Sequence, residues 1–226
     1  TIDLTSSGSI LSYSAFNING EIGKMVKVTS SDSTGEGIHI IQNNDSSNIN
    51  YLDFSNQFSL YDTLKYIHQS LPSAFTVYGG KVTIENSDFK DLKSEDAVNL
   101  FRCEFKIGNI KIENTFSDAF DADFCVGFLK NCSFLNCGND GVDISGGRLE
   151  ISESKFLNIK DKAISAGEES KLKANKCTVQ NSSMGIISKD LSVVKSVDNK
   201  LMNCEIGYCA FQKKGEFGPA EIFSTN

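Results

Sequence analysis

Four segments of this chain repeat one pattern: DAVNLF (residues 96–101), DAFDAD (118–123), DGVDIS (140–145) and KAISAG (162–167). In each segment a charged residue precedes a small residue, and a bulky apolar residue follows. The small residue recurs every 22 positions, at Ala97, Ala119, Gly141, Ala163, Gly185 and Gly207. A constant interval over this many copies indicates a solenoid in which each interval is one coil.

A second column of apolar residues supports the interval: Phe89, Ile112, Phe134, Phe156, Val179 and Leu201. Within the coils, apolar residues alternate with polar ones, as in Val82 and Ile84 or Leu149 and Ile151, and alternation is the pattern of a β-strand. A coil of 22 residues has room for short strands and turns, whereas helical repeats need ~33–45 residues. The sequence therefore predicts an all-β fold, a right-handed parallel β-helix solenoid.

We expect residues 1–226 to form a single β-helix domain. Residues 1–76 are less regular and are expected to form irregular N-terminal coils. Residues 77–214 are expected to form the regular coils, and residues 215–226 the C-terminal end.

One stretch departs from the strand pattern. Apolar residues lie at helical spacing between Leu60 and Leu71, and Pro72 would end a helix there. We expect a short capping or inserted helix over residues 59–71. The alternative is a strand row with a long turn.

The composition argues against several partners. With 22 Lys and Arg against 29 Asp and Glu the net charge is -7, and no basic stripe carries interleaved aromatic residues, so no nucleic-acid partner is expected. No apolar run approaches the ~20 residues of a membrane span. The 7 cysteines lack CxxC spacing, which argues against zinc. Cys103 and Cys125 fall in register and are interpreted as buried stacking residues, although a disulfide between them is geometrically conceivable.

Two columns of polar side chains fall in register: Asp96, Asp118 and Asp140 in one, and Asn99, Asp121 and Asp143 in the other. If the bulky column points inward, alternation directs Asp121, Asp143 and the nearby Asp123 outward on one face. Two carboxylates about 5 Å apart repel by roughly 3 kcal/mol at an effective dielectric constant of about 20. A bound cation, a lysine or a proton should therefore neutralise them. Oxygen ligands of this kind suit calcium, so Asp121, Asp123 and Asp143 are candidate metal ligands.

The same columns have other interpretations. Asp and Asn are favoured at turns because their side chains bond to neighbouring backbone groups, so the role of the columns can be structural. A third interpretation is that the carboxylates of these columns act as acid and base in catalysis. Arg102, Lys189 and Lys213 lie in or after these coils and are candidate substrate-binding residues for an anionic polymer.

The repeated segments 94–102, 116–124, 138–145 and 161–168 together resemble right-handed parallel β-helix repeat proteins of bacterial secreted or surface type, in the pectin-lyase-like superfamily. The resemblance covers roughly residues 77–220 and implies the fold. It also implies a secreted, periplasmic or cell-surface location. The chain begins at Thr1 without a basic or apolar leader, and we expect a mature or trimmed form.

Enzyme signatures of that superfamily carry over poorly. The Gly-His-Gly of polygalacturonase-like enzymes is absent, and where epimerase-like enzymes carry Asp-Pro-His-Asp, Asp118-Ala119-Phe120-Asp121 lacks the histidine. Pectate lyase-like enzymes hold calcium on aspartates and use an Arg or Lys base. By residue type alone, Asp121, Asp123 and Asp143 match the aspartates, and Arg102, Arg148 or Lys189 matches the base.

The favoured function is therefore a non-catalytic β-helix module of a larger exported or cell-surface protein, associated with a polysaccharide or cell-surface glycan. The alternative is a calcium-dependent polysaccharide lyase or C5-epimerase acting on a uronate polymer. A further alternative is a phage tail or adhesin shaft. The sequence leaves the oligomeric state open.

Overall fold

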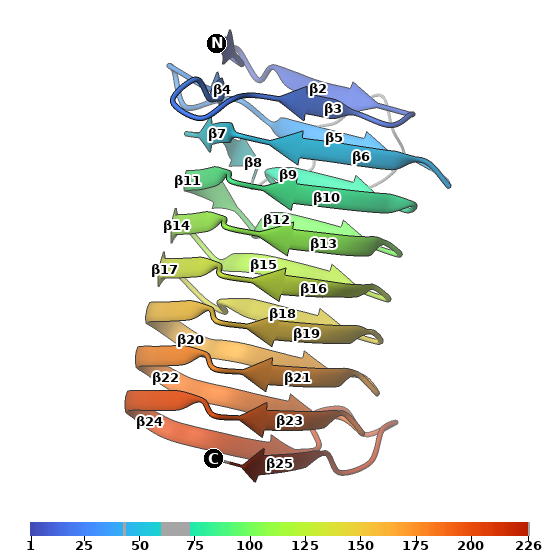
Figure 1. Cartoon of the computed structure of the whole chain (residues 1–226), viewed down its shortest axis with the longest axis vertical. Helices are drawn as coiled ribbons and strands as arrows, with labels where there is room; N and C mark the ends of the chain where they lie inside the picture. Colours follow the sequence, from blue (N-terminus) through green and yellow to red (C-terminus); the bar gives the residue numbers. More distant parts are fainter. Residues whose placement is uncertain (43, 60–72, 226) are drawn as a thin grey trace.

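The computed structural model describes residues 1–42, 44–59 and 73–225. These residues form strands β1 to β25 and no helix. The strands stack as coils along one long axis, with the first coil at one end and the last at the other (Figure 1).

Three rows of strands make up the coils. The first row contains β1 (Ile2–Asp3), β4 (Val26–Thr29), β7 (Leu52–Ser55), β11 (Asp88–Ser94), β14 (Lys111–Thr115) and β17 (Ser133–Cys137). The second row contains β2 (Ser9–Ser12), β5 (Gly37–Ile41), β9 (Phe75–Tyr78), β12 (Asp96–Phe101), β15 (Asp118–Asp123) and β18 (Val142–Ser145). The third row contains β3 (Asn17–Asn19), β6 (Ser46–Asn50), β10 (Lys81–Glu85), β13 (Glu104–Gly108), β16 (Val126–Lys130), β19 (Arg148–Ser152), β21 (Lys171–Asn175), β23 (Val193–Val197) and β25 (Glu221–Thr225).

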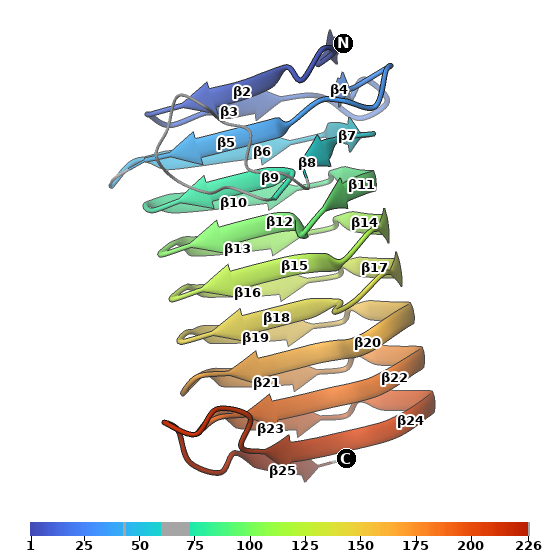
Figure 2. The same cartoon turned by 180° about the vertical axis from the view of Figure 1, so that it is seen from behind.

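In the last coils the first two rows merge into the long strands β20 (Lys155–Gly167), β22 (Thr178–Lys189) and β24 (Lys200–Phe211). The short strand β8 (Phe58–Ser59) pairs with β11. Among the described residues, the first and second rows belong to one 16-stranded sheet and the third row is a nine-stranded sheet. Figure 1 faces the nine-stranded sheet, and Figure 2 faces the second row on the opposite side.

Strands of successive coils pair in parallel. Lys81 of β10 pairs with Glu104 of β13, and Glu104 pairs with Val126 of β16, so the register advances by 23 and then 22 residues. The prediction of an all-β parallel solenoid is confirmed, with coils of about 23 residues.

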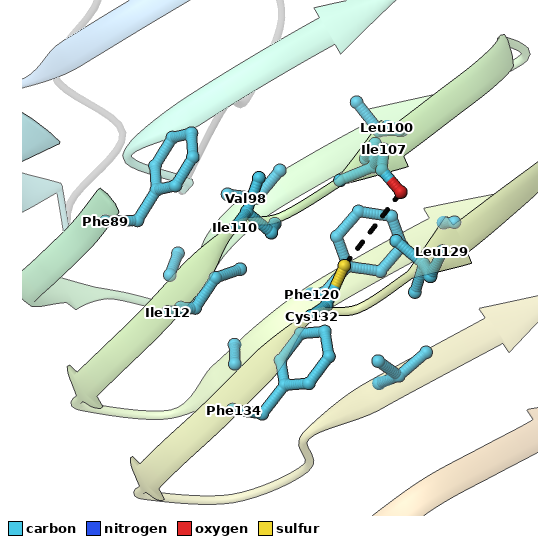
Figure 3. Close-up of a cluster of buried hydrophobic side chains, with 14 of the residues drawn as sticks. Phe89, Val98, Leu100, Ile107, Ile110, Ile112, Phe120, Leu129, Cys132 and Phe134 are labelled. Atoms are coloured by element: carbon cyan, nitrogen blue, oxygen red, sulfur yellow. Dashed lines mark hydrogen bonds between the residues drawn. The ribbon is translucent and has the colours of Figure 1, made fainter. Parts of the chain in front are cut away.

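Apolar columns fill the interior between the rows. The predicted inward column is fully buried over its first five members, Val98, Phe120, Val142, Ile164 and Ile186, whereas Tyr208 in the last coil is 38% exposed. In Figure 3, Phe89, Ile112 and Phe134 of the first row follow one another from coil to coil. Phe134 stacks on Phe156 of the next coil with ring centroids 4.8 Å apart. Each column thus buries apolar area against its own repeat, and this burial is the main stabilising contribution.

The column of small residues lies where the backbone of the next coil is close. A Cβ atom at Gly141 would lie 2.6 Å from the carbonyl oxygen of Ala163. A Cβ at Gly185 would lie 2.5 Å from the carbonyl oxygen of Gly207. The restriction of this column to Ala and Gly therefore reflects steric limits on the distance between coils.

Asparagines stack at two turns of the coil. One ladder contains Asn114, Asn136, Asn158, Asn181 and Asn203, all with φ between 51° and 58°. Each amide Nδ2 donates to the side-chain oxygen of the residue one coil earlier at 2.9–3.2 Å, beginning at Asp91. A second ladder links Asn50, Asn86, Asn109 and Asn131. Asparagine suits these positions because it tolerates positive φ and its amide can both donate and accept.

Two sequence expectations concern smaller features. The helix expected over residues 59–71 lies outside the described residues, except for Ser59, which ends β8. All seven cysteines are free thiols, so the conceivable Cys103–Cys125 disulfide is not formed. Instead, Sγ of Cys125 accepts the backbone N–H of Cys103 at 3.2 Å, and both side chains are buried.

The asparagine ladder predicts a graded loss of stability. Asn158→Ala removes two ladder hydrogen bonds and places alanine at positive φ, so we expect it to lower the free energy of urea unfolding by about 2–3 kcal/mol. Asn158→Gly, which keeps the conformation, should cost about 1–2 kcal/mol. Asn203→Ala at the end of the ladder breaks one bond and serves as the comparison. Wild-type stability in Asn158→Ala would contradict a stabilising ladder.

Candidate functional site

Six aspartates lie on or beside β12, β15 and β18, on the outer side of the second row. We call them the acidic face: Asp96, Asp118, Asp121, Asp123, Asp140 and Asp143. Asp96 pairs with Asp118 and Asp121 pairs with Asp143 across neighbouring strands, which confirms the predicted register. Such strands lie ~4.8 Å apart, so like charges directly opposite each other destabilise the fold unless they are compensated.

An amide and a proton compensate one part of the acidic face. Nδ2 of Asn99 donates to Asp96 Oδ2 at 3.1 Å and to Asp121 Oδ2 at 3.0 Å. Burial, helped by the negative charge of Asp118, raises the pKa of Asp96 to about 8. Burial and the charge of Asp96 raise the pKa of Asp121 well above its usual range. The Asp96–Asp121 pair therefore holds a proton at neutral pH.

Backbone groups and a lysine compensate the next part. Oδ1 of Asp118 accepts the backbone N–H of Asp140 at 2.9 Å and the amide of Asn139 at 2.6 Å, although burial still raises the pKa of Asp118. Oδ1 of Asp140 accepts both the backbone N–H and Nζ of Lys162 at 3.0 Å. Burial raises the pKa of Asp140 to about 6 even though Lys162 opposes this shift.

A second lysine reaches across two coils. Nζ of Lys189 lies 3.3 Å from Asp143 Oδ2, and the lysine side chain is only 7% exposed. Its path crosses Gly167, where a Cβ atom would come within 3.3 Å of Lys189 Cε. Among the described residues, Asp123 has no lysine within ion-pair distance, and burial together with the charge of Glu168 raises its pKa although Lys214 opposes this shift.

Beside the carboxylates lies an aromatic cluster formed by Tyr78, Phe101 and Phe124. Tyr78 stacks on Phe101 with ring centroids 5.1 Å apart, and Phe101 meets Phe124 edge to face at 5.6 Å. The guanidinium carbon of Arg102 lies 5.2 Å from the Phe101 centroid, and Nη1 donates to the Tyr78 hydroxyl at 3.3 Å. Phe124 is 54% exposed, so the cluster presents an aromatic surface to solvent.

The predicted substrate-binding cations have different environments. Arg102 is exposed and lies on the aromatic cluster, next to the end of β12. Lys189 is buried against Asp143, one of the predicted metal ligands. Lys213 is exposed on the loop after β24, and its backbone N–H donates to Asp190 Oδ1 at 2.6 Å. The structure therefore brings Arg102 and Lys189 to the acidic face and its aromatic border, whereas Lys213 faces solvent near Asp190.

The aromatic cluster was not predicted from the sequence. Tyr78 and Phe101 are partners in the ladder of β9 and β12, so the repeat contained this signal. Phe124 directly follows β15, at a positive φ of 54°. A Cβ atom at Gly146 on the next coil would lie 2.7 Å from the Phe124 ring, so a glycine at this position leaves the space that the ring occupies.

The family model described as a right-handed beta helix region matches residues 96–218, which contain the acidic face and most of the regular coils. The chain belongs to this family. No curated protein matches this right-handed β-helix protein. Among solved structures, the full-length tailspike protein 2 of Escherichia coli O157:H7 bacteriophage CAB120 is similar over 99% of this chain, with 10% sequence identity and a TM-score of 0.47. The β-helix chain spans 36% of the length of that tailspike.

Two further observations concern ligands and membranes. Within residues 1–42, 44–59 and 73–225, no group of three or more His, Cys, Asp or Glu side chains is arranged to hold a metal ion. The calcium site at Asp121, Asp123 and Asp143 stays a prediction. In the same part of the β-helix chain, no helix has the length and apolar character needed to cross a bilayer.

The acidic face predicts a pH-dependent stability. The pKa of Asp96 is about 8 in the folded protein, whereas an unfolded aspartate titrates near about 4. Between these two pKa values the folded state therefore binds more protons than the unfolded state does. The contribution of Asp96 to the free energy of unfolding falls as the pH rises from about 4 through about 8. We expect the midpoint of thermal unfolding to be several degrees lower at about pH 9 than at about pH 5.

Asp121→Asn removes the charge beside Asp96 and should make this pH-dependent decrease smaller. Asp198→Asn, at an exposed carboxylate on another turn, is the matched control and should behave as the wild type does. An undiminished decrease in Asp121→Asn would show that the pair is not responsible.

Calcium binding is measurable by isothermal titration. The ammonium group of Lys189 competes for Asp143, so we expect weak binding by the wild type and about tenfold tighter binding by Lys189→Met, in which that charge is lost. The double variant Asp121→Asn/Asp143→Asn should not bind. If neither the wild type nor Lys189→Met releases or absorbs heat with calcium, the predicted metal site is wrong.

Proposed function

We propose that this chain is a non-catalytic β-helix module of a larger exported or cell-surface protein, and that it binds a glycan across the aromatic cluster and the acidic face. The observation that carries the proposal is the exposed ring of Phe124, packed edge to face on the half-buried Phe101–Tyr78 stack, directly beside a row of carboxyl and amide groups. Family membership supports the β-helix module itself.

The two parts of this surface suit the two chemistries of a sugar. An aromatic ring packs against the apolar C–H face of a pyranose, and Phe124 offers such a ring with more than half of its surface free. Carboxylates accept hydrogen bonds from sugar hydroxyls, and the protonated member of the Asp96–Asp121 pair can donate one. The amide of Asn99 is held by two carboxylates, so its orientation is fixed before a ligand arrives.

The solenoid also suits a polymer rather than a single sugar. Successive coils present neighbouring positions ~4.8 Å apart, a distance close to the length of one residue in an extended polysaccharide. The cluster runs along this axis through three coils, since Tyr78, Phe101 and Phe124 come from or follow β9, β12 and β15. A linear glycan lying parallel to the axis would pack on the exposed Phe124 ring and continue past the half-buried Phe101 and Tyr78.

Compensated charges argue for binding over catalysis. A general acid and base need two carboxyl groups of different protonation, each free to exchange a proton with the substrate. Here Asp96 and Asp121 share one amide donor, and Asp143 is held by Lys189. These contacts favour a rigid binding surface. The uronate lyase or epimerase is the alternative that the experiment below distinguishes.

We expect Phe124→Ala to bind at least about tenfold more weakly to any polysaccharide that retards the wild type in a gel, because an exposed aromatic anchor is lost from the surface. Affinity electrophoresis against dextran, glucomannan, arabinogalactan and the uronate polymer alginate measures this. Phe116→Ala is the matched control, because Phe116 is 61% exposed on a different part of the coil. Equal retardation of both variants and the wild type would contradict the proposed site. Release of reducing ends or unsaturated sugars that Asp121→Asn abolishes would show that the chain is an enzyme.

A further inference from the structure

The outer side of the nine-stranded sheet carries a second and different surface. Strands β16, β19, β21 and β23 enclose a shallow trough of about 570 Å³. Its charged walls contain Arg148, Lys171, Lys173 and Lys195, and one carboxylate, Glu150. Figures 1 and 2 show that this sheet faces away from the second row, so the trough and the acidic face lie on opposite sides of the solenoid.

The cations of the trough stack against one another. Arg148 is the register partner of Lys171, and Lys173 is the register partner of Lys195. Like charges directly opposite each other on neighbouring strands destabilise a sheet. The sequence thus places two repulsive pairs side by side in a chain whose net charge is -7.

The Lys173–Lys195 pair is partly compensated, whereas the Arg148–Lys171 pair is not. Lys173 pairs with Glu150 at 2.8 Å. Among the described residues, Arg148, Lys171 and Lys195 have no carboxylate within ion-pair distance. On the opposite side, by contrast, Lys162 and Lys189 each pair with an aspartate of the acidic face. A surface that retains unpaired like charges is stabilised when an external anion binds to it.

We propose that this trough, which we call the basic trough, binds an acidic polysaccharide chain lying parallel to the solenoid axis. Arg148 and Lys171 are register partners on neighbouring strands, ~4.8 Å apart, and Lys195 lies on the following coil two residues beyond Val193, the partner of Lys171. Three unpaired cations on successive coils suit a polymer that carries about one negative charge per sugar. Val126 and Phe128, which are 50% and 52% exposed, lie on β16 at the end of the same trough and supply apolar contact for the sugar rings. The ligand class, the residues and the face all differ from those of the proposed glycan site, so the two proposals stand or fall separately.

The geometry favours this ligand over two other anions. Double-stranded DNA carries a charge every ~1.7 Å, far denser than the cations of the trough, and the acidic chain as a whole repels it. A bilayer needs apolar side chains that project beyond their surroundings. Valine and phenylalanine are shorter than the lysines and arginine around them, so those cations would reach the membrane first.

The test uses the whole chain and two probes, polygalacturonate and dextran sulfate, in biolayer interferometry at low salt. We expect both polymers to bind, with an affinity that falls as the salt concentration rises. Lys171→Glu/Lys195→Glu should weaken binding by at least about tenfold. Lys24→Glu/Lys27→Glu makes the same change in net charge in the N-terminal coils and should bind nearly as the wild type does.

A second readout separates loss of binding from loss of folding. Lys171→Gln relieves one repulsive pair, so its thermal midpoint should equal or exceed that of the wild type while its affinity for dextran sulfate falls. The proposal is overturned if neither polymer binds, or if the Lys171/Lys195 double variant binds as tightly as the wild type. Stronger binding to single-stranded DNA or to phosphatidylglycerol vesicles would also overturn it, because the trough would then serve a different anion.

Discussion

In a parallel solenoid every side chain lies ~4.8 Å from the side chain at the same position of the next coil. This constraint shapes the whole molecule, because a residue type that stacks well on itself is favoured in a column and one that repels itself is not. Apolar residues satisfy it in the interior, where Phe134 stacks on Phe156. Asparagine satisfies it at the turns, since its amide donates to one neighbour and accepts from the other.

Columns of like charges satisfy the same constraint poorly because the charges repel. The two faces of the solenoid differ in how far this repulsion is compensated. On the acidic face a proton, the amide of Asn99, and lysines 162 and 189 neutralise the carboxylates. On the opposite sheet Arg148 and Lys171 stack without a carboxylate partner among the described residues. The first arrangement yields a rigid polar surface beside aromatic rings. The second leaves exposed positive charge that an external anion would stabilise.

The fold could be predicted from the sequence because it depends on periodicity. The 22-residue interval of Ala119, Gly141 and Ala163 is visible without knowledge of any contact, and it determines the coil, the register and the inward column. The register of Asp121 and Asp143 followed from the same interval.

The electrostatics of the site could not be predicted in this way. The proton on the Asp96–Asp121 pair depends on burial, and the Lys189–Asp143 contact depends on a side chain crossing two coils. The complete aromatic cluster does not follow from the repeat, because only Tyr78 and Phe101 share a register position. Phe124 follows β15, one residue beyond Asp123, which is the partner of Phe101. Periodicity identifies residues that share a column, but not residues that meet between columns.

The asparagine ladders have a consequence for how such a chain can evolve. Because each coil contacts mainly the coils before and after it, a duplicated segment of one coil length would find the same amide donors and acceptors on both sides and extend the molecule. The deletion of a single residue is a larger change, because it would exchange inward and outward positions up to the next turn. Selection on this gene should therefore tolerate gains and losses of whole coils more readily than small frame-preserving insertions within a strand.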